Sequence, residues 1–175
     1  MKRKFAIRYT LLFTTCFLFQ NSFADTNSIK SITIINPKWE VLERSSRITY
    51  EISSAIANIN PVNLNISLTY PNLNIFKNGV LSAEITSKEG RLDNETKEFI
   101  FYGSSKLIKN KNKNSSSTTG KAEKISFLPQ KDQISLKGSS LLETKKFLIE
   151  ADEIYLDFDS MKIIKSTELK MKTKK

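Results

Sequence analysis

Five carboxylates fall within ten residues near the C-terminus, in the stretch IEADEIYLDFDS at 149–160. They are Glu150, Asp152, Glu153, Asp157 and Asp159. Clustered carboxylate oxygens suit a hard cation such as Ca²⁺, and a pair of carboxylates suffices for glycoside hydrolysis. However, the stretch lacks the glycine and the distal glutamate of a calcium loop, and hydrolase pairs follow no local spacing rule. The competing interpretation is the outer face of a β-strand.

The apolar residues between the acids favour the strand. Ile154 and Leu156 occupy even positions, whereas Ile149 upstream is odd, so the alternation of faces changes phase once within the stretch. A change of phase by one residue indicates a bulge or a sharp bend. We therefore predict a strand kinked near 151–152, with its acids pointing away from the apolar face. A turn at 157–160 should follow, because Asp and Ser side chains bind nearby backbone amides.

The first 24 residues have the three-part pattern of a secretory signal. Four positive charges and no acid precede an apolar run at 9–19, and Ser22-Phe23-Ala24 offers the small residues needed for cleavage. The apolar run is shorter than the ~20 residues of a transmembrane helix. We predict a signal peptide at 1–24, with an uncleaved membrane anchor as the alternative.

Composition excludes several kinds of chemistry. Cleavage after residue 24 would remove Cys16, the single cysteine, and the chain has no histidine. A disulfide scaffold, a thiolate nucleophile, a cysteine-based zinc site and the commonest general base are thereby excluded. The remaining 151 residues (175 minus 24) suit one domain. Removing four charges lowers the formal net charge from +10 to +6, which favours anionic partners such as lipid phosphates, and export disfavours nucleic acid.

Short alternating runs with few glycines predict an all-β chain. Residues 46–52 alternate, and 62–68 would place Val62, Leu64, Ile66 and Leu68 on one strand face. Asn78-Gly79 between two apolar runs predicts a type I′ hairpin. The charged, Ser/Thr-rich tract at 109–120 predicts an exposed loop, and 169–175 a basic tail.

The second half contains an internal repeat. Segment 87–108 aligns without gaps on 122–143, which superposes Gly103-Ser104-Ser105 on Gly138-Ser139-Ser140. A looser third copy superposes Ala122 on Ala151. Each copy reads as strand, polar turn, strand and glycine. Because one such hairpin cannot bury its own apolar face, the copies must stack around a shared core.

This arrangement resembles the OstA-like domain of the lipopolysaccharide-transport periplasmic proteins, the LptC and LptA family. The resemblance covers roughly residues 37–165, and Ser87-Lys88 stands where the family usually has Ala-Asp. The features that carry it are a strand leading to Ala55, Pro71 before a strand, the hairpin at Asn78-Gly79, the charged strand start at 86–91, and the strand end Phe101-Tyr102-Gly103.

The resemblance implies a twisted, open β-jellyroll over 25–168, whose two sheets form a V-shaped groove without enzymatic activity, metal or cofactor. It implies a periplasmic protein that holds the lipid A acyl chains of lipopolysaccharide and pairs through its edge strands with other export proteins, bridging the inner and outer membranes. Inner-membrane association and homo-oligomers are compatible with this scheme. The alternatives left open are an exported structural or adhesive β-repeat with a closed core and no lipid, and a small exported hydrolase. The candidate groove residues share the apolar faces: Leu92, Phe99, Phe101, Phe127, Ile134, Leu136, Ile149, Ile154, Leu156 and Phe158.

Overall fold

The computed structural model describes residues 31–43, 48–109 and 117–174, so the predicted signal peptide lies outside the described residues. The described residues form fourteen strands and one 3-10 helix. In chain order these are β1 (Ile32–Ile35), β2 (Lys38–Glu43), β3 (Ile48–Ser53), β4 (Ile56–Ile59), β5 (Ile66–Thr69), β6 (Asn72–Lys77), β7 (Val80–Thr86), β8 (Glu89–Leu92), β9 (Phe99–Lys109), β10 (Thr118–Leu128), η1 (Pro129–Lys131), β11 (Gln133–Glu143), β12 (Phe147–Asp157), β13 (Ile163–Thr167) and β14 (Lys170–Thr173). None of these elements is a helix long and apolar enough to cross a bilayer.

The strands form nine antiparallel passes of the chain, each bent once near its middle. The four long strands β9 to β12 bend without a break. The other passes are pairs of short strands, β1/β2, β3/β4, β5/β6, β7/β8 and β13/β14, each joined by two residues at the bend. We call the line of bends the vertex and the opposite side, where the passes end, the mouth.

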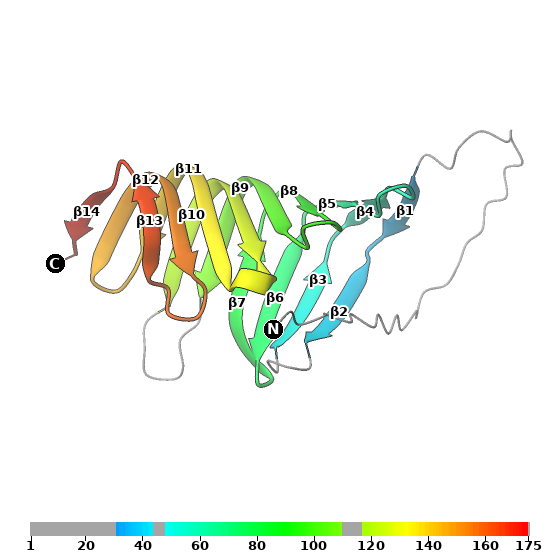
Figure 1. Ribbon diagram of the computed structural model, residues 1–175, viewed down its shortest axis with the longest axis horizontal. Helices are drawn as coiled ribbons and strands as arrows, with labels where there is room; N and C mark the ends of the chain where they lie inside the picture. Colours follow the sequence, from blue (N-terminus) through cyan, green and yellow to red (C-terminus); the bar gives the residue numbers. More distant parts are fainter. Residues whose placement is uncertain (1–30, 44–47, 110–116, 175) are drawn as a thin grey trace, which may run out of the picture.

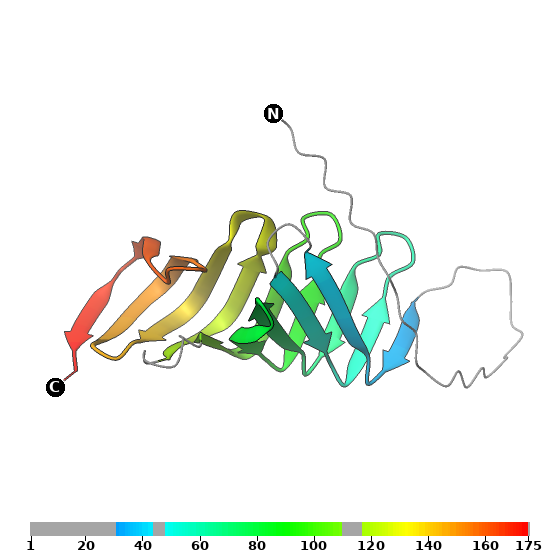
Figure 2. The same ribbon diagram turned by 90° about the horizontal axis from the view of Figure 1, so that it is seen from below.

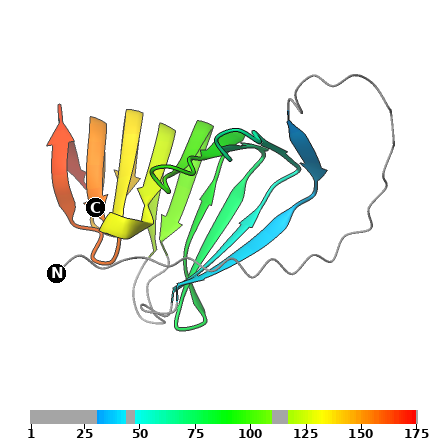
Figure 3. The same cartoon turned by 45° about the vertical axis from the view of Figure 1, so that its right-hand side comes forward.

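The bends divide the strands into two layers. The first layer has the order β1, β4, β5, β8, then the halves of β9 to β12 at 99–102, 124–128, 133–137 and 153–157, then β13. The second layer has the order β2, β3, β6, β7, then the other halves of β9 to β12, then β14. The passes are stacked along the long axis, from β1 and β2 at one end to β14 at the other (Figures 1 and 2). Figure 3 shows the N-terminal strands leaning relative to the C-terminal ones, as expected of a twisted stack.

Glycine-serine pairs produce the bends in β9 and β11. Gly103 and Gly138 have φ of 73° and 77°, and the register of both strands shifts there. A bulge of this kind bends a strand and changes which face later side chains occupy. Ser105 donates a hydrogen bond to the Glu123 carbonyl (3.5 Å), and Ser140 donates to the Asp152 carbonyl (3.2 Å). These equivalent contacts show that the sequence repeat is a structural one.

The kink predicted near 151–152 is confirmed. Ala151 and Ile154 are both buried while Asp152 between them is exposed, so β12 changes phase there. The type I′ hairpin is also confirmed, because Asn78 and Gly79 have φ of 53° and 75°.

The strand predicted over 62–68 is wrong in its first half, since β5 begins only at Ile66. Val62 is 91% exposed and Leu64 has a φ of 57°. The Asn60 side chain accepts a hydrogen bond from the Val62 amide (2.9 Å), and Asn63 accepts one from the Asn65 amide (3.0 Å). Such local hydrogen bonds compete with strand pairing.

The exposed loop predicted at 109–120 is shorter than expected at both ends. Lys109 ends β9 and is buried, and β10 begins at Thr118, while 110–116 lie outside the described residues. Lys170–Thr173 of the predicted basic tail form β14, which pairs with β12.

Candidate functional site

The space between the two layers is filled by aromatic side chains. The ring of Tyr50 in the second layer lies 6.3 Å from that of Phe99 and 5.8 Å from that of Phe127 in the first layer. The Phe127 ring in turn lies 5.2 Å from the Phe158 ring. Tilted ring pairs at these distances are favourable beyond their buried area, so the middle of the molecule is a closed core.

The candidate groove residues belong to this core. Leu92 is half-buried, and the other nine are exposed by 7% or less. The structure brings them together on the inward faces of the two layers. Ile149 comes from the second layer, and the others line the first.

The strands of the two layers cross at an angle, so the strands that face each other are further apart in the stack at the mouth than at the vertex. Near the vertex, a Cβ at Gly120 of β10 would meet the Leu136 side chain of β11, one pass further on. Closer to the mouth, Tyr50 of β3 faces rings from β9 and β10. At the mouth, Lys77 of β6 reaches Asp159, which follows β12. Each layer therefore extends beyond the other at one end.

The first layer is left uncovered at the N-terminal end. Ile32, Ile59, Ile66 and Leu92 are aligned across β1, β4, β5 and β8 in the same inward row as the buried Phe99. Ile32 is 48% exposed, and the other three are half-buried. We call these four residues the N-terminal ledge, an apolar surface continuous with the core.

The second layer is left uncovered at the C-terminal end. Phe147 and Met171 are 37% and 53% exposed, and Met171 is aligned with the buried Ile149 on the inward face. These three residues form the C-terminal ledge. The apolar interior therefore opens at both ends, on opposite layers.

Two lysines of the second layer contact the first layer across the mouth. Lys77 forms an ion pair with Asp159 (2.7 Å), and the Lys109 Nζ lies 3.4 Å from the centre of the Phe158 ring. Lys109 also donates a hydrogen bond to the Ser82 hydroxyl (2.9 Å). Ser82 is the extra residue of a bulge in β7, and a bulge can re-aim a side chain in this way.

Burial lowers the pKa of Lys109 to about 8, although Asp159 opposes the shift and favours the charged form. The charged Lys77 nearby acts in the same direction as burial. The mouth thus holds a buried cation that is only partly compensated.

The acids of 149–160 are distributed outside the core, as their alternation predicted. Glu150 pairs with Lys172 (3.3 Å), and Glu153 pairs with Lys137 (3.3 Å). The Asp157 carboxylate accepts hydrogen bonds from the Ser160 hydroxyl (2.6 Å) and amide (2.8 Å), which lower its pKa and build the predicted turn. Within the described ranges, no group of three or more acidic or cysteine side chains could hold a metal ion.

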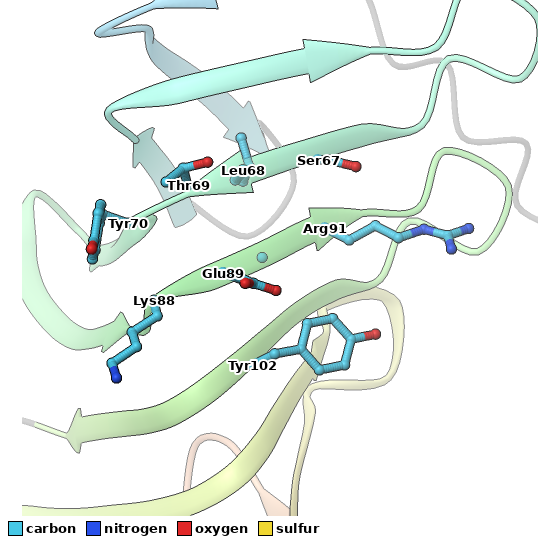
Figure 4. A pocket seen from close by; sticks show the side chains of 9 residues that line it. Ser67, Leu68, Thr69, Tyr70, Lys88, Glu89, Arg91 and Tyr102 are labelled. Atoms are coloured by element: carbon cyan, nitrogen blue, oxygen red, sulfur yellow. The ribbon is translucent and has the colours of Figure 1, made fainter.

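A shallow depression of about 450 Å³ lies on the outer face of the first layer, away from the interior. Ser67, Thr69, Glu89, Arg91 and Tyr102 line it, from β5, β8 and β9 (Figure 4). It is separated from the core by the first layer, so it is not part of the apolar surface between the layers.

Both ends of the stack are edges in the described part of the chain. β1 and β2 each pair with one strand only, as do β13 and β14. An edge strand presents free backbone donors and acceptors to another chain.

Sequence reasoning named Leu92 and Ile149 of the ledges but missed their other residues, and it missed the mouth lysines. Lys109 was assigned to a loop because the tract beside it is charged, although it continues the odd-numbered inward face of Ser105 and Leu107. That alternation is the signal that could have identified it.

Comparisons with known proteins agree with this architecture. The family model described as lipopolysaccharide-assembly, LptC-related, matches residues 9–163. A search of curated proteins found no match. A solved structure with a similar fold is the crystal structure of LptH from Pseudomonas aeruginosa, the LptA homologous periplasmic component of its conserved lipopolysaccharide transport device. The TM-score is 0.60 at 9% identity, over 72% of this chain and 95% of that chain.

Proposed function

The chain belongs to the LptC-related family of lipopolysaccharide-assembly proteins, and on this premise we propose that it carries lipid A acyl chains along its inward apolar faces and acts without catalysis. Family and fold give it a role in lipopolysaccharide transport. The observation that carries the acyl-chain proposal is the continuity of the closed core with a half-exposed apolar ledge at each end.

The ledges suit acyl chains for a simple energetic reason. Transfer of one CH₂ group from water to an apolar surface contributes about 0.8 kcal/mol, so a few covered methylenes give useful affinity without any polar contact. The ten candidate groove residues form the inward surface along which the chains would pass. Passage through the middle requires the layers to separate, because Phe127, Leu136 and Ile154 have no exposed surface.

We propose that the edge strands join this protein to other export proteins. An added strand would continue the ladder beyond β1 and β2, or beyond β13 and β14. Pairing at both ends would produce a bridge between the membranes in which successive ledges meet. The same edges allow copies of this chain to associate.

A periplasmic location follows from the same proposal. The signal-like segment at 1–24 directs export, and the family match begins inside its apolar run. Cleavage would release the protein, whereas retention would anchor it to the inner membrane. The basic charge of the remaining chain favours an anionic lipid.

A photoreactive amino acid on β4 tests the acyl-chain proposal. Ile59 and Ile56 are on the same strand, but Ile59 faces inward on the N-terminal ledge and Ile56 faces outward. Lipopolysaccharide should crosslink to a probe at position 59 and not at 56, and Ile59→Asp should weaken binding. A probe at Leu136 tests in addition whether the core opens to the ligand.

Equal crosslinking from positions 56 and 59 would indicate non-specific contact and would contradict the proposal. Absence of crosslinks from every inward position would do the same. Circular dichroism of each variant shows whether a lost crosslink reflects a lost fold.

The second candidate function is an exported structural module with a closed core and no lipid. The complete burial of Phe127, Ile134 and Leu156 favours it. Native mass spectrometry of protein extracted from membranes separates the two candidates, because a carrier retains bound lipopolysaccharide and a structural module does not.

A further inference from the structure

Four polar side chains form a compact square on the outer face of the first layer. Lys124 of β10 is directly opposite Lys137 of β11, and Ser126 is directly opposite Ser135. Residues two apart on a strand share a face, so both pairs lie on the same surface. Neighbouring strands are ~4.8 Å apart, which brings the two hydroxyls within reach of one small ligand.

The two serines are buried although they face outward. Ser126 is 5% exposed and Ser135 is 9% exposed. Neither hydroxyl has a hydrogen-bond partner in the described part of the chain. Both hydroxyl oxygens remain in contact with solvent. Among the described residues, Asn72 Oδ1 is the side-chain polar atom that has neither solvent contact nor a hydrogen-bond partner. Unpaired hydroxyls at the floor of a depression are donors available to a ligand.

The depression above the serines measures about 180 Å³. Lys124 and Lys137 stand at one end of it, with Leu128, Gln133 and Glu98 toward the other. It can hold a phosphate group together with part of an attached sugar, whose hydroxyls could donate to Glu98 and Gln133.

The two lysines carry like charges on directly opposite residues. Like charges directly opposite each other destabilise a sheet. Lys124 lies over the Tyr102 ring (5.5 Å) on one side, and Lys137 lies over the Tyr155 ring (5.3 Å) and beside Glu153 (3.3 Å) on the other. The two ammonium groups therefore lean apart, toward β9 and β12, and leave the space over the serines open between them.

We propose that this square binds a phosphate group, with the ammonium groups of Lys124 and Lys137 supplying charge and the hydroxyls of Ser126 and Ser135 donating hydrogen bonds from below. Charge-assisted hydrogen bonds to phosphate oxygens are stronger than neutral ones. The site is on the opposite side of the first layer from the acyl-chain surface, so we assign the phosphate to the headgroup of a lipopolysaccharide molecule outside the interior, an assignment that rests on the proposed function. The proposal that the square binds phosphate is argued from its four side chains and does not depend on the proposed function.

Titration of the full chain with inorganic phosphate, lipopolysaccharide and enzymatically dephosphorylated lipopolysaccharide tests the site. Calorimetry measures affinity, and amide NMR shifts locate the ligand. Both phosphate-bearing ligands should shift the amides of Ser126 and Ser135, and dephosphorylation should remove that shift. The variant with Lys124→Gln and Lys137→Gln should bind phosphate about tenfold more weakly, because two exposed charge contacts are lost. Ser126→Ala with Ser135→Ala should weaken it several-fold without changing the net charge.

Lys106 and Lys121 provide the matched control. They are also directly opposite each other, on the outer face of the second layer, and both are exposed. Their double Gln variant loses the same charge and should bind within about twofold of the parent. Equal weakening by both lysine pairs would reduce the effect to general electrostatics and overturn the proposal.

The remaining outcomes distinguish the existence of the phosphate site from the origin of the phosphate that it binds. Absence of shifts at Ser126 and Ser135 with either phosphate source overturns the site. Equal shifts there from native and dephosphorylated lipopolysaccharide, with inorganic phosphate still bound, overturn the headgroup assignment and leave a site for free phosphate. If lipopolysaccharide shifts the amides of Ser126 and Ser135 but does not crosslink to a probe at position 59, the acyl-chain proposal is contradicted and the phosphate site is not.

Discussion

The ammonium group of Lys109, in the second layer, lies 3.4 Å from the centre of the Phe158 ring in the first. The contact joins the layers at the mouth, and only 4% of Lys109 remains exposed. A desolvated cation over an aromatic face is stabilised by the ring quadrupole, while burial favours the neutral amine.

Lys109 should make stability rise with pH in alkaline solution. Its pKa falls from 10.5 in the unfolded chain to about 8 in the folded protein. Between these values the unfolded chain binds more protons, so the free energy of unfolding increases as the pH rises from about 8 to 10.5. Lys109→Met should lack this increase, as urea denaturation across the range would show. If the free energy of unfolding of the variant rises equally, the increase comes from titratable groups other than Lys109.

The ion pair between Lys77 and Asp159 should stabilise the mouth only slightly. Its side chains are 43% and 50% exposed, so a double-mutant cycle with alanine should give a coupling of about 0.5 kcal/mol that weakens in salt. Amide exchange near Ser82 and Phe158 should accelerate. The Lys38–Glu51 pair (3.3 Å) joins neighbouring strands of one layer, and its removal should leave exchange at the mouth unchanged.

Gly138 should tolerate alanine less well than Gly79. Both have φ near 75°, at 77° and 75°, so both variants should lose about 1 kcal/mol from left-handed backbone strain. A Cβ at Gly138 would also lie 3.0 Å from the Glu123 Cβ, whereas nothing lies within 4 Å at Gly79. Gly138→Ala should therefore lose about 1–2 kcal/mol more. Equal losses would show that Glu123 moves aside freely.

Asp157 should contribute to acid sensitivity. Hydrogen bonds from the Ser160 side chain and amide lower its pKa below 3.8 in the folded protein. The stabilisation is fully present above 3.8 and is lost as the pH falls through the folded value. Asp157→Asn keeps an acceptor but not the charge, so it should lose less stability than the parent between neutral pH and about pH 3. Asp152→Asn, at an exposed carboxylate on the same strand, serves as the control.

Most strands, the kink of β12 and the hairpin could be predicted because they follow from local patterns. The change of phase at Asp152 marks the bend directly, since a bulge must re-phase the alternation. The glycines at 103 and 138 were wrongly read as strand ends, because β9 and β11 bend there and continue. The asparagines near Val62 were misread, because an alternating run does not reveal that side chains have captured the backbone amides.

The ledges could not be predicted, because they depend on how far two layers cross. Ile66 and Phe99 share an inward row and an apolar pattern, yet one is half-buried and the other buried. Crossing is a cumulative result of twist over several passes. The pairing of Lys124 with Lys137 likewise needed the register of β10 against β11.

The bends also determine where the chain can change in length. Each broken pass crosses the vertex in two residues, at 36–37, 54–55, 70–71, 87–88 and 168–169. Among the connections at the mouth whose residues are all described, the length ranges from two residues at 78–79 to six at 60–65 and 93–98. An insertion after Asn94 would enlarge a surface turn, whereas one after Ser54 would displace the backbone hydrogen bonds that join Ser54 and Ala55 to neighbouring passes. Relatives of this chain should therefore gain and lose residues along one side of the molecule and keep their spacing along the other.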